Sequence, residues 1–273
     1  MPNEISSVIL VGGGKMGGAL LNGWIKCGTS PNAISLIEPD SKAGAGLYQR
    51  FGVRVHTQAA EYVSGGAQAI VFAVKPQVMD SVVRQYRQFV GPTTVFLSIA
   101  AGKTLGYFAE MLGAEAAVVR AMPNTPATIG KGITVACGNA VLAHDQRTIC
   151  DSLLGAVGEV IWIDDEVHLD AVTAVSGSGP AYVFLLIECL TRSGTHAGLP
   201  PELANRLAHA TVCGAGALAG SSGEPAEVLR KNVTSPGGTT ACALDVLMGD
   251  DGIAPIFDRA VAAAAARSRE LAQ

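Results

Sequence analysis

The sequence has few charged residues and no clustered metal ligands. Only 15% of its 273 residues are Asp, Glu, Lys or Arg, and the net charge is −4. A protein that binds nucleic acid through a basic surface needs the opposite balance, so this class is excluded. The six cysteines form no C-x-x-C pair, and the five histidines form no ligand cluster. We therefore predict reduced thiols in a cytoplasmic protein, and no metal site.

Two kinds of hydrophobic segment are also missing. The first residues lack the positively charged region of a secretory signal, and the first apolar run stops at Val11. No later apolar stretch is long and uninterrupted enough to span a bilayer, which predicts a protein without a membrane partner. The chain is nevertheless 49% hydrophobic, which is ample for a core. Its length fits one large domain or two ordinary ones.

The apolar run Val8–Val11 ends in a glycine-rich turn, and a helical pattern follows. Gly12, Gly14 and Gly17 have the spacing G-x-G-x-x-G. In a dinucleotide-binding loop the first glycine permits the tight turn, the second admits the pyrophosphate, and the third lets helix and strand pack closely. The start of the helix adds free N–H groups and a partial positive charge. The strand before the loop and the helix after it favour dinucleotide binding over an ordinary glycine turn.

The next strand-like run ends in Glu38, roughly 20 residues after Gly17, where an acid that binds the ribose is expected. Strand-like and helix-like segments continue to alternate, which predicts a parallel sheet with crossover helices. The loops at the carboxyl ends of such strands gather along one edge. In chain order these loops are Gly12–Gly17, Glu38–Lys42, Ala73–Gln77, Ser98–Gly102 and Met122–Pro126.

Strand signals stop near residue 164, and helical patterns follow. Ser176–Pro180 interrupts them, and we predict a helix break there, because no base accompanies a serine nucleophile. The helical half is too short and alanine-rich to build a large core, so we expect its helices to pack against a second subunit. The predicted class is α/β. A Rossmann-type doubly wound parallel sheet occupies residues 1–164, and an all-helical dimerisation and substrate-binding domain occupies residues 165–273.

One loop in the helical half, Thr234–Thr240, combines a Ser-Pro turn, two glycines and two threonines. Gly237 and Gly238 allow a ligand to approach the backbone closely. The free N–H groups at the start of the following helix suit a small anion such as a carboxylate. A turn between two helices with a threonine cap explains the same residues. The loop by itself leaves both interpretations open.

Several motifs in order resemble the pyrroline-5-carboxylate reductase family over essentially the full length of the chain. They are Gly12–Gly17, Ala73–Gln77, Arg120–Pro126, Asp170–Thr173 leading into Ser176–Tyr182, and Asn232–Thr240, of which the last is the most specific. The resemblance implies reduction of the cyclic imine 1-pyrroline-5-carboxylate to L-proline, the last step of proline biosynthesis. It also implies NADPH or NADH as cofactor and a homo-oligomer built from dimers.

The resemblance also implies roles for individual residues. The spacing selects Gly12, Gly14, Gly17 and Glu38 for the cofactor, and the resemblance adds Gly13, Lys15, Met16, Gln58, Ala73, Val74, Lys75, Pro76, Ala100, Ala101, Gly102 and Asn232. The resemblance also implies that the substrate is bound by Ser235, Gly237, Gly238, Thr239 and Thr240. Thr240 and Glu166 are the implied catalytic residues. Lys15 departs from the asparagine or glutamine usual in the family, and would face the pyrophosphate or project into solvent.

Two other classes of protein share parts of this pattern. A hydroxyacid dehydrogenase of similar layout carries a lysine base on the first long helix of its second domain, but residues 181–197 contain no lysine. A sensor that only binds nicotinamide nucleotides would have no use for a carboxylate site at Ser235–Thr240. Lys75 precedes Pro76 at a strand end, so we assign it to the cofactor loop, or to a solvated cap, rather than to catalysis. Hydride transfer to a protonated imine needs orientation and electrostatics, which these residues can supply.

Overall fold

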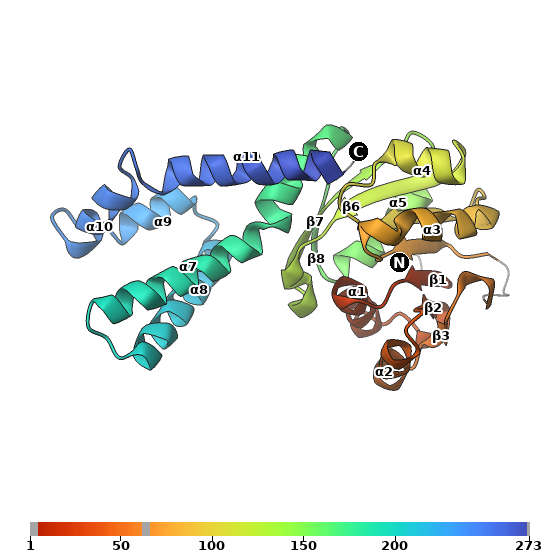
Figure 1. The fold of residues 1–273 in the computed structure, drawn as a ribbon, viewed down its shortest axis with the longest axis horizontal. Helices are drawn as coiled ribbons and strands as arrows, with labels where there is room; N and C mark the ends of the chain where they lie inside the picture. The colour runs from red at the N-terminus through yellow and green to blue at the C-terminus, as the bar shows by residue number, and fades with distance from the viewer. Residues whose placement is uncertain (1–4, 62–65, 272–273) are drawn as a thin grey trace. The chain divides into compact units, whose positions relative to one another are not determined.

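The computed structural model describes residues 5–61 and 66–271, and the first half of this described chain is built on one eight-stranded sheet (Figure 1). The strands are β1 (Val8–Val11), β2 (Ile34–Ile37), β3 (Arg54–His56), β4 (Ala69–Phe72), β5 (Val95–Ser98), β6 (Ala117–Met122), β7 (Gly132–Gly138) and β8 (Gly158–Trp162). Their order is β3-β2-β1-β4-β5-β6-β7-β8. The strand order reverses between β1 and β4, so the predicted doubly wound sheet is confirmed.

The sheet is parallel except at one pair of strands. β1 to β6 run in one direction, which places the carboxyl ends of β1, β2, β4, β5 and β6 at the same edge. The five loops predicted to gather along one edge do so. β7 pairs with β6 in the antiparallel sense, and β8 follows β7 in parallel. The predicted parallel sheet thus contains one antiparallel pair, at β7, whose direction depends on pairing and not on any local pattern.

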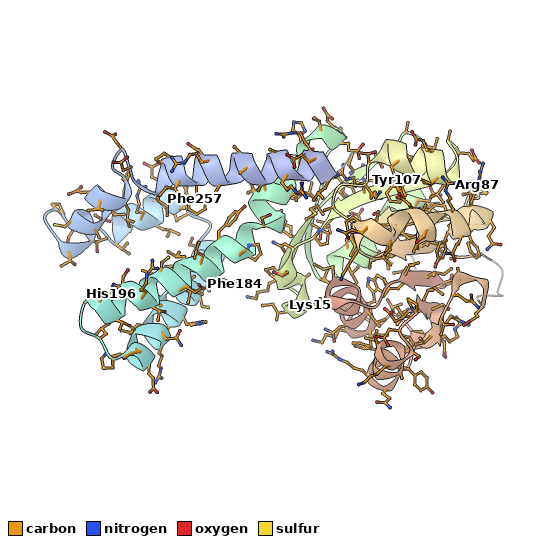
Figure 2. The ribbon with its side chains drawn as sticks, in the orientation of Figure 1. Lys15, Arg87, Tyr107, Phe184, His196 and Phe257 are labelled. Atoms are coloured by element: carbon orange, nitrogen blue, oxygen red, sulfur yellow. The ribbon has the colours of Figure 1, made fainter. Side chains whose placement is uncertain are left out.

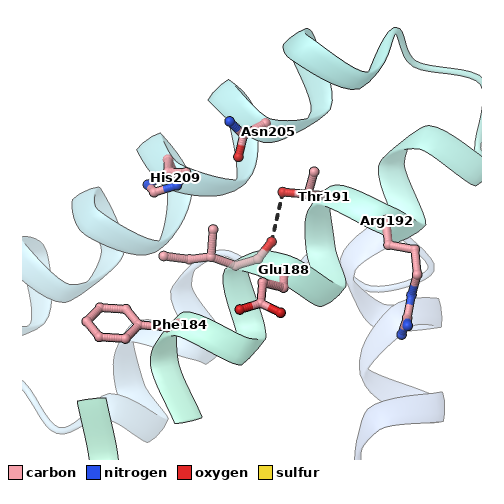
Figure 3. A pocket seen from close by; sticks show the side chains of 7 residues that line it. Phe184, Glu188, Thr191, Arg192, Asn205 and His209 are labelled. Atoms are coloured by element: carbon pink, nitrogen blue, oxygen red, sulfur yellow. Dashed lines mark hydrogen bonds between the residues drawn. The ribbon is translucent and has the colours of Figure 1, made fainter. Parts of the chain in front are cut away.

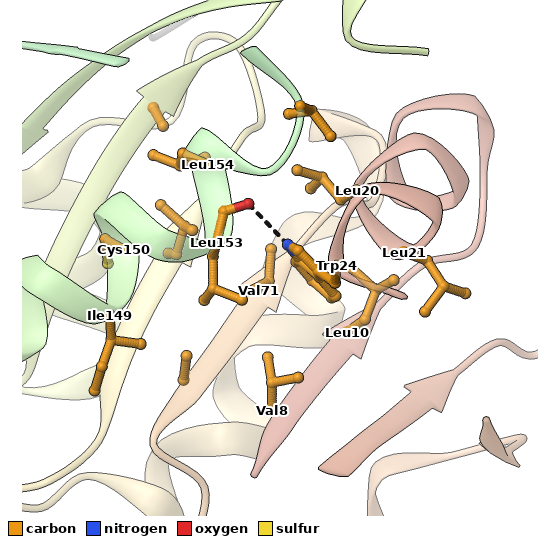
Figure 4. Close-up of a cluster of buried hydrophobic side chains, with 14 of the residues drawn as sticks. Val8, Leu10, Leu20, Leu21, Trp24, Val71, Ile149, Cys150, Leu153 and Leu154 are labelled. Carbon is orange, nitrogen blue, oxygen red and sulfur yellow. Dashed lines mark hydrogen bonds between the residues drawn. The ribbon is translucent and has the colours of Figure 1, made fainter. Parts of the chain in front are cut away.

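Helices pack on both faces of the sheet. One face is covered by α1 (Lys15–Lys26), α2 (Ser41–Phe51) and α5 (His144–Gly155), and the other by α3 (Met79–Val83) and α4 (Leu105–Leu112). On the first face Trp24 lies among buried leucines and its Nε1 donates to the carbonyl of Leu153 at 2.8 Å (Figure 4). On the second face the ring of Phe72 lies between those of Tyr86 and Phe108 at 5.4 and 6.0 Å. Both faces are therefore buried, as a parallel sheet requires.

The helical segment between β4 and β5 is α-helical over only part of its length. α3 covers only Met79–Val83, and a 3-10 segment continues over Arg84–Phe89. Val83 and Tyr86 are buried and Phe89 is half-buried, so the apolar side chains here recur every three residues. A 3-10 helix has three residues per turn and aligns these side chains on one side, which an α-helix does not do.

The chain divides into two compact units, one of residues 1–177 together with 265–273, the other of residues 178–264. The second unit contains α7 (Gly179–His196), α8 (Pro201–Ser222), α9 (Ala226–Asn232), α10 (Thr239–Leu247) and most of α11 (Ile253–Leu271). Within it the rings of Tyr182 on α7 and Phe257 on α11 meet edge to face at 6.0 Å. A domain boundary between residues 164 and 165 stays a prediction.

The predicted break at Ser176–Pro180 is a bend in a continuous helical path. α6 (Leu169–Val172) passes through a π-helical turn, Thr173–Gly177, and α7 follows with Pro180 in its first turn, where proline is tolerated. Residues 166–196 therefore form one helical run of 31 residues, which contains an 18-residue window with a mean hydropathy of 1.3, and 11% of that window is buried. By length and composition alone this run is long enough to cross a membrane. The prediction that no stretch reaches this length is wrong, because the π turn carries the helix past the glycines.

Candidate functional site

The glycine loop lies at the switch point of the sheet, between β1 and α1. Gly12 has a φ of +97°, and a side chain there would approach the carbonyl of Ala73 to 2.9 Å. A Cβ on Gly17 would collide with the carbonyl of Gly12. Gly14 is the N-cap of α1, and no described atom lies within 4 Å of the position that its Cβ would take. The turn and the packing thus require Gly12 and Gly17, while Gly14 presents open backbone at a helix N-terminus, which fits a pyrophosphate.

Glu38 lies beside this loop. Its Oε2 accepts a hydrogen bond from the N–H of Gly13 at 2.8 Å, and its Oε1 accepts one from the N–H of Asp40 at 3.1 Å. The carboxylate is half-buried at the end of β2. Gln58 is exposed in the turn that follows β3, the strand next to β2. The structure therefore brings the predicted ribose acid to the glycine loop and places Gln58 after the neighbouring strand.

The loops after β4 and β5 complete this edge. The N–H of Ala73 donates to the carbonyl of Val11 at 2.8 Å, which joins the end of β4 to β1. Lys75 is exposed, and Pro76 opens a 3-10 turn. Lys15, the first residue of α1, is also exposed (Figure 2). The predicted cofactor residues that this edge brings together are Gly12, Gly13, Gly14, Lys15, Met16, Gly17, Glu38, Ala73, Val74, Lys75, Pro76, Ala100, Ala101 and Gly102.

A cluster of three polar side chains ties the loop after β5 to α3. One carboxylate oxygen of Asp80 accepts hydrogen bonds from Lys103 Nζ at 2.8 Å and from the Tyr107 hydroxyl at 2.7 Å. The Lys103 ammonium also lies 4.3 Å from the centre of the Tyr107 ring. The hydrogen bond from Lys103 lowers the pKa of Asp80, and burial followed by the Asp80 hydrogen bond raises the pKa of Tyr107. Asp80 is therefore ionised and Tyr107 neutral at pH 7.

Glu166 is engaged in an ion pair with a buried arginine. Its Oε1 accepts from Arg120 Nη1 at 2.8 Å and from the N–H of Leu105, the first residue of α4, at 2.8 Å. The side chain of Arg120 is 6% exposed and that of Glu166 is 26% exposed. Burial and the nearby Glu166 charge raise the pKa of the adjacent Cys137 thiol. Arg120 is not among the predicted site residues, although one arginine in an otherwise apolar strand signals a buried, paired charge.

The predicted carboxylate loop lies in the second unit, between α9 and α10. Gly237 has a φ of +68°, and a Cβ on Gly238 would collide with the Ser235 hydroxyl. Gly238 is the N-cap of α10, and no side chain of the described residues caps this helix. The alternative of a threonine-capped turn is therefore wrong, because the threonines are the first two residues inside α10. The uncapped N–H groups leave the helix start available to an anion.

Side chains around this loop differ in exposure. Ser235 and Thr239 are exposed, Thr240 is half-buried, and Asn232 is the exposed last residue of α9. The hydroxyl of Thr234 donates to the carbonyl of Arg230 at 2.6 Å and is thus committed to the end of α9. The predicted substrate residues and Asn232 lie in the second unit, and the remaining predicted residues lie in the first.

A glycine loop at the switch point of a doubly wound sheet, with an acid at the end of the second strand, defines a nicotinamide-dinucleotide-dependent oxidoreductase of the Rossmann type. The family model described as "NADP oxidoreductase coenzyme F420-dependent" matches residues 7–102. The helical half matches a second model, "Pyrroline-5-carboxylate reductase dimerisation", over residues 166–271.

Similarity to known proteins extends over the whole chain. It is 39% identical to pyrroline-5-carboxylate reductase of Pseudomonas aeruginosa over 267 residues, which is 97% of each chain. The solved reductase of Coxiella burnetii matches with a TM-score of 0.92 and 33% identity, covering 99% of this chain and 100% of that one. The reductase of Plasmodium falciparum, solved with NADP bound, matches with a TM-score of 0.84 and 30% identity over all of both chains. The chain belongs to the pyrroline-5-carboxylate reductase family and is an NAD(P)H-dependent oxidoreductase.

Proposed function

We propose that this protein reduces the cyclic imine 1-pyrroline-5-carboxylate to L-proline with NADPH or NADH, the last step of proline biosynthesis. Full-length membership of the family carries the proposal. The test is the loss of absorbance of NADPH or NADH when the imine is added to the purified protein. No imine-dependent oxidation with either cofactor would contradict the proposal. A 2-hydroxyacid offered with the oxidised cofactors is the control for the rival dehydrogenase class.

In this proposal the first unit holds the cofactor, which supplies the hydride when bound. The open backbone at Gly14 and the start of α1 receive the pyrophosphate. Lys15 adds a positive charge at the same helix start. Ala73–Pro76 and Ala100–Gly102, which follow β4 and β5, line the cofactor on the other side of the switch point. Asn232, at the end of α9, is assigned to the nicotinamide end.

Glu38 is proposed to bind the ribose of the cofactor and to discriminate between NADH and NADPH. Its carboxylate accepts hydrogen bonds from a free ribose hydroxyl and repels a 2′-phosphate. Glu38→Ala should therefore raise the NADPH/NADH ratio of kcat/KM by about tenfold, which corresponds to about 1.4 kcal/mol. Glu38→Gln is the matched control for the loop, because the amide oxygen still accepts from the N–H of Gly13. A ratio unchanged in Glu38→Ala would show that Glu38 serves only to hold the glycine loop.

The second unit is proposed to hold the substrate. The backbone of Gly237, Gly238 and Thr239, with the Ser235 hydroxyl, binds the carboxylate of the imine at the uncapped start of α10. A carboxylate fixed at this helix end leaves the Thr240 hydroxyl to meet the ring nitrogen. This hydroxyl orients the iminium and guides its proton as hydride arrives.

Glu166 is proposed to favour the iminium through its negative charge. Arg120 and Leu105 bind Oε1, and no described residue donates a hydrogen bond to Oε2. We therefore assign Oε2 to a water that contacts the iminium, and Oε1 to the anchoring of the carboxylate. Because Arg120 already balances the charge, the electrostatic contribution of Glu166 is expected to be smaller than that of an unpaired carboxylate.

The helical half is proposed to form a dimer, from which larger assemblies are built. Large apolar side chains of α7 are open to solvent in the single chain, among them Phe184 at 58% exposure (Figure 2). A cavity of about 460 Å³ between α7 and α8 is lined by Phe184, Ile187, Glu188, Thr191, Arg192, Asn205 and His209 (Figure 3). These elements lie inside the segment that matches the dimerisation family. A second copy of the chain covers such a surface without exposing apolar area.

If the protein is a dimer, its molar mass in solution should reflect this. Light scattering after size-exclusion chromatography should give an even multiple of the chain mass of 27.9 kDa at micromolar concentration. Phe184→Asp, which places a charge in the exposed apolar face, should shift the population toward monomer, and Tyr48→Asp, at an exposed position in the first unit, should not. A wild-type protein that runs as a monomer would contradict the dimer.

A further inference from the structure

The last turn of α11 touches the loop that follows β5. Gly102 is buried in this loop with a φ of +76°, and a Cβ there would lie 2.7 Å from the carbonyl oxygen of Leu271. Both residues belong to the first compact unit, although α11 begins in the second. Any side chain at position 102 would therefore push the loop and the helix apart. The loop is Ala100–Gly102, which the proposed function assigns to the cofactor.

A buried hydrogen bond fastens the same turn of α11. Ser268 is 3% exposed, and its hydroxyl donates to Oδ1 of Asp170 on α6 at 2.6 Å. A hydroxyl donating to a carboxylate at this distance is among the stronger hydrogen bonds in proteins. Ala265, one turn earlier, is 8% exposed. The end of α11 is thus packed into the first unit and cannot move freely against the loop.

The same end of the loop is also held by the cluster of Asp80, Lys103 and Tyr107. Lys103, the next residue after Gly102, is bound to Asp80 on α3 at 2.8 Å. The loop Ala100–Gly102 is therefore fixed by α3 through Lys103 and by α11 through Leu271. Such contacts leave the loop few alternative conformations. The loop therefore loses less conformational entropy when a ligand binds.

We propose that the last turn of α11, Ser268–Leu271, is a positioning element for the dinucleotide. It fixes the backbone of Ala100–Gly102 in the conformation that receives the cofactor, and it touches neither cofactor nor substrate itself. This inference rests on the proposed function, since that function makes the loop a cofactor loop. Ser268 and Gly102 are the residues through which the helix acts on the site.

The test compares NADPH affinity in full-length variants, measured as the dissociation constant from fluorescence titration. Gly102→Ala wedges a methyl group between the loop and Leu271, and the dissociation constant for NADPH should rise by about tenfold, because the displaced loop has to be reordered when the cofactor binds. Gly52→Ala is the matched control, because Gly52 has a φ of +68° and no described atom within 4 Å of its Cβ position. It carries the same backbone strain without the contact, and its affinity should stay within about twofold of wild type. The kcat at saturating NADPH should stay near the wild-type value in the control variant Gly52→Ala.

A second pair of variants keeps the proposal testable if Gly102→Ala does not fold. Ser268→Ala removes the hydrogen bond to Asp170 and should weaken NADPH binding by about fivefold, whereas Ser268→Thr keeps the hydroxyl and should restore it. Wild-type affinity in both Gly102→Ala and Ser268→Ala overturns the inference and leaves the proposed function intact. Wild-type protein that binds no NADPH overturns both.

Discussion

Thr240→Val should lower kcat/KM for 1-pyrroline-5-carboxylate by roughly 5- to 150-fold, because one buried hydrogen bond is worth about 1–3 kcal/mol. The substitution keeps the shape of the side chain and deletes the hydroxyl that we assign to the ring nitrogen. Thr240 is half-buried in the first turn of α10, and this helix has Gly238 as its N-cap, so no capping bond is lost. The dissociation constant for NADPH should stay near that of wild type, since the glycine loop lies in the other unit.

Thr239→Val is the matched control for this experiment. Thr239 precedes Thr240 in the same turn, and we assign its backbone N–H, which valine retains, to the substrate carboxylate. Its loss of kcat/KM should therefore be smaller. A Thr240→Val protein that stays folded and dimeric with full kcat/KM would make the hydroxyl structural, and the proposed route of the proton would be wrong.

Glu166→Ala should lower the free energy of unfolding by about 3 kcal/mol. The variant leaves Arg120, which is 5% exposed, with its charge unpaired, and it removes the acceptor of the N–H of Leu105. Removing one partner of a buried ion pair costs about 3–5 kcal/mol, and the lower end applies because Glu166 is partly exposed. Urea denaturation at one fixed protein concentration measures the change, since the stability of an oligomer depends on concentration.

Two comparison variants test whether the loss of stability in Glu166→Ala comes from leaving a buried charge unpaired. Glu227→Ala breaks the exposed pair of Glu227 with Lys231 on α9 and should cost only about 0.3–0.5 kcal/mol. Arg120→Met combined with Glu166→Ala removes both buried charges and should recover part of the loss seen in Glu166→Ala. If Glu166→Ala is no less stable than Glu227→Ala, the ion pair of Arg120 with Glu166 does not contribute the expected free energy of unfolding.

Local pattern was enough to find the glycine loop but not every helix near it. The loop at Gly12–Gly17 is a local object, because the turn, the packing and the open helix start all depend on residues within one strand–helix unit. No helix was predicted over Leu105–Leu112, although Thr104 caps it by accepting from the N–H of Tyr107 at 3.0 Å. A threonine before an apolar helical pattern is a local signal that was available.

Within the candidate site, local spacing also predicted some features but not others. The spacing from Gly17 to Glu38 anticipated a carboxylate near the loop, because the strand and helix between them have nearly fixed lengths. The partner of Glu166 is 46 positions away in the chain, and no spacing rule links an acid in a turn to an arginine within a strand. Only the folded protein therefore shows that Oε1 of Glu166 is occupied by Arg120 and Leu105, which leaves Oε2 for the proposed water.

The sequence by itself determined that strands and helices alternate and then give way to helices, where the glycine loop lies, and which loops share an edge. These properties follow from backbone sterics and hydrophobic period within about 20 residues. Only the tertiary structure decided the antiparallel direction of β7, the π turn that keeps the helix continuous into α7, and the contact of Leu271 with Gly102. Each of these depends on packing between segments far apart in the chain, where local propensity is a weak guide and burial decides.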